Sequence, residues 1–112
     1  MILWFTGISG VGKTLIASYI YKKLKKKIKN IIHIDGDKFR EMLKNDLGYT
    51  LKDRNENAER IINFVHFLDN QNINLIISAN LTSQKYRLYC KEKFKRFYEI
   101  NISADINTLK KR

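Results

Sequence analysis

Apolar residues along this chain gather in four short blocks that have the length and spacing of β-strands. Three blocks are largely continuous apolar runs, at residues 2–5, 31–34 and 75–79. Such runs are typical of strands whose two faces are both covered. The fourth block, residues 97–102, alternates between apolar and polar side chains, which also favours a strand.

Between these blocks, apolar residues recur at intervals of three and four positions, which predicts helices. The helices are expected over residues 13–27, 38–45, 51–70, 84–94 and 105–112. Thr50 and Ser83 have the side chains that cap helix starts, and Asp53 gives Thr50 the spacing of a capping box. In the first helix, the buried stripe is expected to consist of Leu15, Ile16, Tyr19, Ile20 and Leu24.

The predicted order is β-α-β-α-α-β-α-β-α, and alternation of this kind indicates one α/β domain over residues 1–112. We expect a parallel sheet with helices on both faces, which is a three-layer arrangement. In such sheets ligands bind at the carboxyl ends of the strands. Three segments far apart in the sequence, 7–14, 35–37 and 79–82, therefore converge on one rim.

The segment GISGVGKT, residues 7–14, fits the phosphate-binding pattern GxxxxGK[ST] and lies between a predicted strand and a predicted helix. Its glycines allow backbone N–H groups to turn around a phosphate chain, and the helix start adds a positive dipole. Lys13 is expected to reach the β- and γ-phosphates of ATP, and the Thr14 hydroxyl to ligate Mg²⁺. The alternative is a glycine-rich turn without a ligand. The predicted ATP-binding residues are Gly7, Ser9, Gly10, Val11, Gly12, Lys13 and Thr14.

Asp35 and Asp37 follow the second predicted strand directly and are separated by one residue. Phosphoryl transfer requires a phosphate cradle, a metal and an oriented acceptor. We expect Asp35 to hold Mg²⁺ through a water molecule, and Asp37 to bind the acceptor hydroxyl and take its proton. The alternative is that either aspartate caps the following helix or shapes the turn.

The charge and composition limit the possible partners. The formal net charge of +11 favours anionic partners, but the lysine cluster at 22–29 lacks the interleaved aromatic residues of a nucleic-acid platform. We interpret it as a solvated face and expect no nucleic-acid partner. The single cysteine, Cys90, excludes an internal disulfide and is expected to be a packed thiol, and His33 and His66 are expected to be structural. The sequence shows neither a signal peptide nor a membrane-spanning run, which predicts a cytoplasmic protein without a membrane partner.

Three segments of the chain, FTGISGVGKT, HIDGDKFREML and DLGYTLKDRNENAERI, resemble the adenylylsulfate (APS) kinase family. The resemblance covers nearly the whole chain and implies a P-loop kinase fold. It implies transfer of the ATP γ-phosphate to the ribose 3′-hydroxyl of a small nucleotide, with ATP and Mg²⁺ required. It further implies that the acceptor nucleotide is contacted by Asp37, Arg40, Tyr49, Arg54 and Asn57.

Two segments differ from the family pattern near the anionic tip of the acceptor. Glu59–Arg60 replaces a pair of arginines, and residues 79–82, Ala-Asn-Leu-Thr, replace Phe-Ile-Ser-Pro. Asn80 and Leu81 are therefore expected to contact an altered acceptor. The chain resembles the branch of the family that phosphorylates cytidine diphosphoramidate in capsule synthesis. That nucleotide is the favoured acceptor, and adenylylsulfate is the alternative.

The family pattern continues beyond Arg112 with a basic lid and a last strand, so we expect the C-terminal part of the domain to be absent from this chain. On its own the chain is then expected to bind nucleotide with weak or no turnover, and a non-catalytic ATP-binding module is the alternative from another class. A nucleic-acid-binding protein and a nucleoside-monophosphate or sugar kinase are further alternatives. The resemblance also makes a homodimer possible.

Overall fold

The computed structural model describes residues 1–7, 11–43, 46–81 and 83–102. The predicted order of strands and helices is confirmed as far as the fourth strand, whereas the helix expected over 105–112 lies outside the described residues. The elements are β1 (Ile2–Gly7), α1 (Val11–Lys25), β2 (Ile31–Asp35), α2 (Gly36–Met42), α3 (Leu51–Asp69), β3 (Asn74–Ser78), α4 (Gln84–Lys93) and β4 (Phe97–Ile102).

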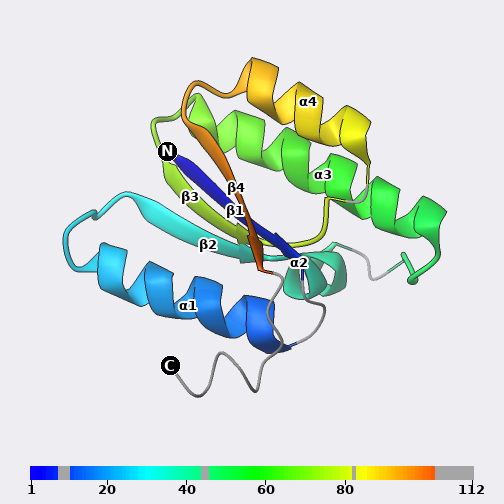
Figure 1. Cartoon of the computed structure of the whole chain (residues 1–112), viewed down its shortest axis with the longest axis horizontal. Coiled ribbons are helices and arrows are strands. Elements are labelled where there is room, and N and C mark those ends of the chain that lie inside the picture. The colour runs from blue at the N-terminus through cyan, green and yellow to red at the C-terminus, as the bar shows by residue number, and fades with distance from the viewer. Residues whose placement is uncertain (8–10, 44–45, 82, 103–112) are drawn as a thin grey trace.

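The four strands form one parallel sheet in the order β2-β3-β1-β4. β1 is an inner strand, and its residue Trp4 pairs with Ile77 of β3 on one side and Glu99 of β4 on the other. Helix α1 covers one face of the sheet, and α3 and α4 cover the other (Figure 1). The predicted three-layer α/β fold is therefore confirmed.

Each face of the sheet has its own apolar core, as the alternation of side chains along a strand requires. On the α3 and α4 face, Trp4, Ile61 and Ile77 are completely buried. On the α1 face, Phe5 and Ile76 pack around Ala17. The two cores hold the sheet rigid between the helices, so the carboxyl ends of the strands form a firm base for a site.

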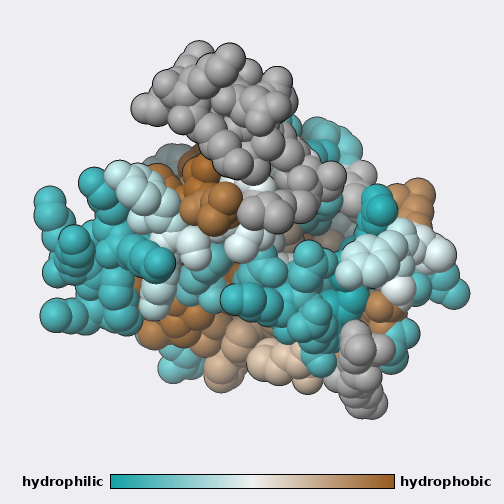
Figure 2. All heavy atoms as spheres, turned by 90° about the horizontal axis from the view of Figure 1, so that it is seen from below, coloured by the Kyte–Doolittle hydropathy of each residue, from teal (hydrophilic) through white to brown (hydrophobic). Residues whose placement is uncertain are grey.

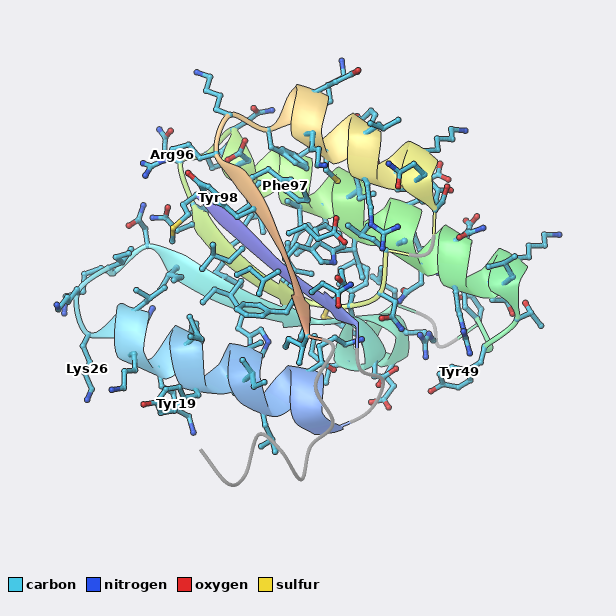
Figure 3. All side chains as sticks on the ribbon, in the orientation of Figure 1. Tyr19, Lys26, Tyr49, Arg96, Phe97 and Tyr98 are labelled. Atoms are coloured by element: carbon cyan, nitrogen blue, oxygen red, sulfur yellow. The ribbon has the colours of Figure 1, made fainter. Side chains whose placement is uncertain are left out.

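The predicted buried stripe of α1 is wrong at two positions. Leu15 and Tyr19 are 53% and 59% exposed, and Tyr19 points away from the sheet (Figure 3). Ala17, which lies on the opposite side of the helix at 100° per residue, is completely buried. The apolar residues of this helix span a wide sector, and a small side chain at the centre of the contact allows α1 to approach the sheet closely.

The prediction that the second strand is covered on both faces is wrong in part. β2 lies at the edge of the sheet, and its residue Ile32 is 38% exposed. Ile31 and Ile34 of the same strand are buried.

Hydrophilic residues cover most of the surface seen from the α1 side (Figure 2). Among the described residues no helix is both long and apolar enough to cross a membrane.

The predicted helix caps are present. The Thr50 hydroxyl accepts a hydrogen bond from the backbone N–H of Asp53 at 3.2 Å, and the Ser83 hydroxyl accepts one from Lys85 N–H at 3.2 Å. The Asp53 carboxylate accepts from Gly48 N–H at 2.9 Å rather than from the backbone of Thr50. This contact ties the segment before α3 to its first turn.

The expected structural roles of Cys90 and His66 are also supported. Cys90 is completely buried, and burial raises the pKa of its thiol to about 12. The His66 ring packs edge-on against Phe94 with 5.9 Å between ring centroids.

Candidate functional site

A pocket of about 280 Å³ lies at the carboxyl ends of the strands. The predicted convergence of three separated segments on this rim is therefore confirmed. The described residues that line the pocket are Lys13, Thr14, Asp35, Gly36, Asp37, Arg40, Tyr49, Arg54, Asn57, Ala58, Ile61, Ser78, Ala79 and Asn80.

The start of the predicted phosphate loop is fixed by Gly7 at the end of β1. Its φ of +107° is one that residues with a side chain rarely adopt. A Cβ at this position would also stand 2.3 Å from the carbonyl oxygen of Ile102. Of the other predicted ATP-binding residues, Ser9 and Gly10 lie outside the described residues, while Val11 and Gly12 begin α1.

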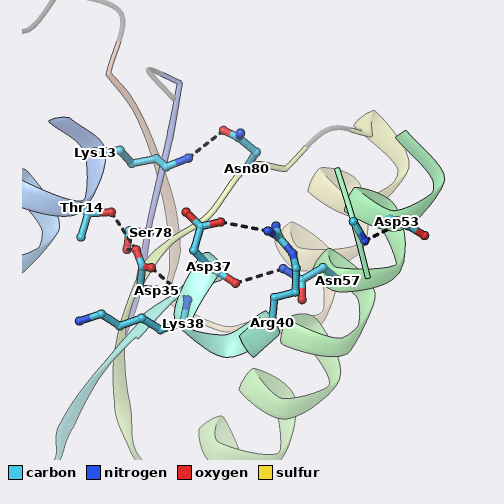
Figure 4. Close-up of polar contacts among 12 residues, drawn as sticks. Lys13, Thr14, Asp35, Asp37, Lys38, Arg40, Asp53, Asn57, Ser78 and Asn80 are labelled. Atoms are coloured by element: carbon cyan, nitrogen blue, oxygen red, sulfur yellow. Dashed lines mark hydrogen bonds and ion pairs between the residues drawn. The ribbon is translucent and has the colours of Figure 1, made fainter. Parts of the chain in front are cut away.

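Lys13 projects from the first turn of α1 into the pocket, where its ammonium Nζ donates a hydrogen bond to Asn80 Oδ1 at 3.0 Å (Figure 4). Burial lowers the pKa of Lys13, and the charges of Asp37 and Asp35 act in the opposite direction. The residue is 7% exposed. A partly desolvated cation whose hydrogen bond to a neutral amide can be exchanged is well suited to a phosphate oxygen.

Asp35 is the centre of a hydrogen-bond cluster that joins α1, β2 and β3. Its Oδ1 accepts from Thr14 Oγ1 at 2.8 Å and from Ser78 Oγ at 2.9 Å, and its Oδ2 accepts from Lys38 N–H at 3.3 Å. Burial raises the pKa of Asp35, but these hydrogen bonds outweigh burial and hold the pKa below its ordinary value. Asp35 therefore caps α2 and contacts Thr14 at once, so its two predicted roles do not exclude each other.

The oxygens of Thr14 and Asp35 fit the needs of Mg²⁺. This ion prefers oxygen ligands, keeps several water molecules and is usually held by one or two side chains together with substrate phosphates. A half-buried carboxylate 2.8 Å from a threonine hydroxyl supplies such a pair. The described residues contain no cluster of three or more His, Cys, Asp or Glu that would form an all-protein metal cage.

Asp37 and Arg40 project from successive turns of α2 and form an ion pair at 3.1 Å. The Asp37 side chain is 65% exposed, whereas that of Arg40 is 10% exposed. The Arg40 guanidinium also lies 4.3 Å from the ring centroid of Tyr49, which is a cation–π contact. Arg40 therefore orients both the carboxylate and the aromatic ring at this end of the pocket.

Two buried side-chain polar atoms in the described part of the chain have no hydrogen-bond partner, and both belong to pocket residues. They are Arg40 Nε and Asn57 Oδ1. The other end of the Asn57 amide, Nδ2, donates to the Gly36 carbonyl at 3.3 Å. An unpaired buried polar group costs about 1–3 kcal/mol. A donor and an acceptor left unpaired in one pocket therefore suit a polar ligand.

Three residues that the sequence analysis placed near the acceptor are not among the described residues that line the pocket. Leu81 is 2% exposed and packs in the core, so any contact of this residue with an acceptor falls to its backbone. Glu59 accepts from the Tyr86 hydroxyl at 3.2 Å, and Arg60 forms two hydrogen bonds with Asp46, at 3.0 and 3.1 Å. Neither Glu59 nor Arg60 is among the described residues that line the pocket.

Ser78 is a polar pocket residue that the sequence analysis missed. The sequence contains a signal that could have identified it, because Ser78 is a hydroxyl residue near the end of a predicted buried strand and directly precedes the rim segment 79–82. Its side chain is almost completely buried, so its hydroxyl requires partners. It finds them in Asp35 Oδ1 and in the His33 ring.

The chain is similar to known proteins in sequence and in fold. A model of the family described as adenylylsulphate kinase matches residues 1–112. Cytidine diphosphoramidate kinase from Campylobacter jejuni is 36% identical over 108 residues, which make up 96% of this chain and 63% of that protein. An adenylyl-sulfate kinase from Halothermothrix orenii is 34% identical over 110 residues, which make up 98% of this chain and 60% of that protein.

Among solved structures, the Mycobacterium tuberculosis APS kinase CysC in complex with AMPPNP and APS is 28% identical, with a TM-score of 0.77. The match covers 99% of this chain and 66% of that one. The chain thus spans less than two thirds of the length of the curated relatives named above.

Proposed function

Since the chain belongs to the adenylylsulfate kinase family, we propose that its protein transfers the γ-phosphate of ATP to a ribose 3′-hydroxyl of a small nucleotide acceptor. The favoured acceptor is cytidine diphosphoramidate, and the alternative is adenylylsulfate. The proposal makes the protein a phosphotransferase that acts on an alcohol group.

One observation carries the proposal: a single pocket brings together the phosphate-loop residues Lys13 and Thr14 and the acceptor-side residues Asp37, Arg40 and Asn57. Phosphoryl transfer depends mainly on positioning and on charge stabilisation. A phosphate-binding lysine and an oriented carboxylate facing one cavity are the parts that this reaction requires.

Within the pocket each side chain has one proposed task. Lys13 leaves Asn80 and binds the β- and γ-phosphates. Asp37, held by Arg40, accepts the proton of the acceptor hydroxyl as that oxygen bonds to the γ-phosphorus, while the bond from the γ-phosphorus to the bridging oxygen breaks and ADP leaves. Thr14 directly and Asp35 through water would hold Mg²⁺, which neutralises phosphate charge when it is bound. Tyr49 presents an exposed ring, 65% accessible, on which the acceptor base stacks.

The choice of acceptor rests on the relative at 36% identity and on Asn80. A sulfate tip offers only acceptor oxygens, whereas a phosphoramidate tip also offers an NH₂ donor. The amide of Asn80 has both a donor and an acceptor. Once the phosphates of ATP draw Lys13 away, Asn80 Oδ1 is released to accept from such an NH₂ group, and Nδ2 can donate to a phosphoryl oxygen.

The test is ADP release by the full-length protein with ATP and Mg²⁺ alone, then with cytidine diphosphoramidate, then with adenylylsulfate. We expect release that depends on cytidine diphosphoramidate, and loss of this release in Lys13→Met. Turnover with adenylylsulfate alone would overturn the preferred acceptor but keep the kinase. ATP binding without acceptor-dependent release would favour a nucleotide-binding module over a kinase.

Asn80→Ser sharpens the choice of acceptor because it shortens the side chain and removes the amide. If Asn80 reads the NH₂ group, this variant lowers kcat/KM for cytidine diphosphoramidate by about tenfold, which corresponds to one hydrogen bond of about 1.4 kcal/mol. The KM for ATP is expected to change less. Asn63→Ser, an exposed position on α3, serves as the matched control.

A further inference from the structure

A chain of hydrogen bonds runs from His33 to Thr14 along the wall of the pocket, which its members Ser78, Asp35 and Thr14 line. His33 Nε2 lies 3.0 Å from Ser78 Oγ, Ser78 Oγ lies 2.9 Å from Asp35 Oδ1, and Asp35 Oδ1 lies 2.8 Å from Thr14 Oγ1. These hydrogen bonds join three elements. They run from β2 to β3, back to the end of β2 and then to α1. The His33 ring is also packed against Tyr21 of α1, with 5.9 Å between centroids.

The number of available protons fixes the direction of this chain. An ionised Asp35 only accepts hydrogen bonds, so the Thr14 and Ser78 hydroxyls must both donate to Oδ1. Each hydroxyl carries a single proton, so the Ser78 oxygen can only accept from His33. The His33 Nε2 therefore carries a proton. With Nε2 unprotonated, one of the two contacts of Ser78 Oγ would lack a proton, so that a lone pair of Ser78 would face a lone pair of either His33 Nε2 or Asp35 Oδ1.

We propose that His33 and Ser78 are positioning residues that fix the Asp35 carboxylate and, through it, the rotation of the Thr14 hydroxyl. With its proton held by Asp35, Thr14 Oγ1 presents its lone pairs to the pocket, where a metal ion bound to nucleotide would accept them. The inference rests on the proposed function, because that function places Mg²⁺ and ATP at Thr14.

The position of Ser78 makes this role specific. Its hydroxyl is one of two that reach the same carboxylate oxygen, and the residue is only 2% exposed. Without Ser78, Thr14 is the one side-chain donor to Asp35 Oδ1 that remains among the described residues, and the carboxylate loses a contact that opposes its rotation. Groups that orient a ligand in this way typically contribute about 10–100-fold to metal affinity.

The first test reads the direction of the chain without any ligand. Nitrogen-15 NMR of the histidine rings distinguishes a protonated Nε2 from a protonated Nδ1, and the sequence has only two histidines to assign. We expect His33 in the Nε2–H tautomer and a changed His33 signal in Ser78→Ala, with His66 unchanged. A neutral His33 ring protonated at Nδ1 would overturn the proposal.

The second test measures the affinity for a non-hydrolysable ATP analogue by calorimetry, with and without Mg²⁺. We expect Ser78→Ala to reduce the affinity in the presence of Mg²⁺ by about tenfold and to change the metal-free affinity by less than about twofold. An equal loss under both conditions would overturn the proposal, since it would show a merely structural role. If the unaltered protein binds no analogue, the proposed function fails, while the NMR result still decides the hydrogen-bond direction.

His33 variants provide the conservative rescue. His33→Gln retains an N–H donor near the position of Nε2, whereas His33→Leu removes it. The glutamine variant is expected to keep most of the gain in affinity that Mg²⁺ provides, and the leucine variant to lose it. Equal behaviour of the two variants would contradict a donor role. His66→Leu, on α3, is the control for loss of a histidine elsewhere.

Discussion

The two halves of the pocket differ in how completely their polar groups are paired. On the phosphate side, Lys13 binds Asn80, and the Asp35 carboxylate accepts three hydrogen bonds. On the acceptor side, Arg40 Nε and Asn57 Oδ1 are buried and have no hydrogen-bond partner among the residues that the structure describes. The described residues of the phosphate side are therefore held by hydrogen bonds to one another, whereas the acceptor side retains bonding capacity that a ligand can use.

This difference suggests where the selectivity of the site resides. A ligand that pairs a buried, unsatisfied group removes a penalty of about 1–3 kcal/mol for each group. A ligand that lacks the matching atom leaves that penalty in place, so a site built to form hydrogen bonds rejects it strongly. The acceptor side is thus expected to discriminate among nucleotides more sharply than the phosphate side.

The largest expected effect comes from removing the proposed base on the acceptor side. Asp37→Asn should lower acceptor-dependent turnover of the full-length protein by about 10²–10⁴-fold, the range that general-base catalysis contributes. ATP affinity should hardly change, because Lys13 and Thr14 are untouched. Steady-state kinetics with calorimetry of an ATP analogue would check this.

The control is Asp69→Asn at the far end of α3, which removes a carboxylate of the same charge away from the pocket. Turnover of Asp37→Asn close to that of the control would exclude Asp37 as the base. A large loss of ATP affinity would instead mean that the two halves of the pocket are not separable.

An intermediate effect is expected at Asn57, where binding and stability should respond differently. Asn57→Leu removes the unpaired Oδ1 and also the 3.3 Å hydrogen bond to Gly36. These changes have opposite signs, so the free energy of unfolding should change by no more than about 1 kcal/mol. The affinity for the acceptor should fall by about tenfold, which corresponds to about 1.4 kcal/mol.

Urea unfolding and acceptor titration of this variant provide the two measurements. Asn63→Leu, at an exposed position of the same helix, controls for the added apolar surface. A loss of stability that accounts for the loss of affinity would show that Asn57 supports the fold rather than the acceptor.

The smallest effect is expected from the pH dependence of stability on the phosphate side. Because the pKa of Asp35 in the folded protein lies below its ordinary value of 3.8, the ionised carboxylate stabilises the fold above that pH. The contribution is lost as the pH falls below 3.8 and through the folded-state pKa. Asp35→Asn should therefore be less stable than the unaltered protein at pH 7, by about 1 kcal/mol.

Denaturant unfolding of both proteins at neutral pH and near pH 3 checks this expectation. The difference in unfolding free energy between them should narrow at the lower pH. A difference that is independent of pH would show that the hydrogen bonds of Asp35 do not favour its ionised form.

Local patterns along the sequence predicted the helices and strands well, because strand runs and helix caps depend on neighbouring residues. Thr50 and Ser83 cap the predicted helices, and Lys13, Asp37 and Arg40 face one pocket as expected. The predictions that failed concern tertiary packing instead. Which side of α1 faces the sheet depends on how closely Ala17 packs, and helical spacing alone does not contain that information.

The contacts of the site were harder to predict, because they form between side chains far apart in the sequence. The pairing of Lys13 with Asn80 spans 67 positions, and that of Asp35 with Ser78 spans 43. Glu59, expected near the acceptor tip, is instead hydrogen-bonded to Tyr86 of α4. The expected bounds of its helix, 51–70, agree with α3 to within one residue. The miss therefore concerns which side of α3 faces the pocket, and tertiary packing decides that rather than local sequence.

The single tryptophan of the chain gives the rim an optical consequence. Trp4 is completely buried, and its indole N–H donates to the carbonyl of Ala79 at 2.8 Å, one residue before Asn80. Any displacement of that rim segment changes the hydrogen bond and hence the surroundings of the indole ring. The intrinsic fluorescence of the unlabelled protein should therefore report on ligand-dependent movement at residues 79–80.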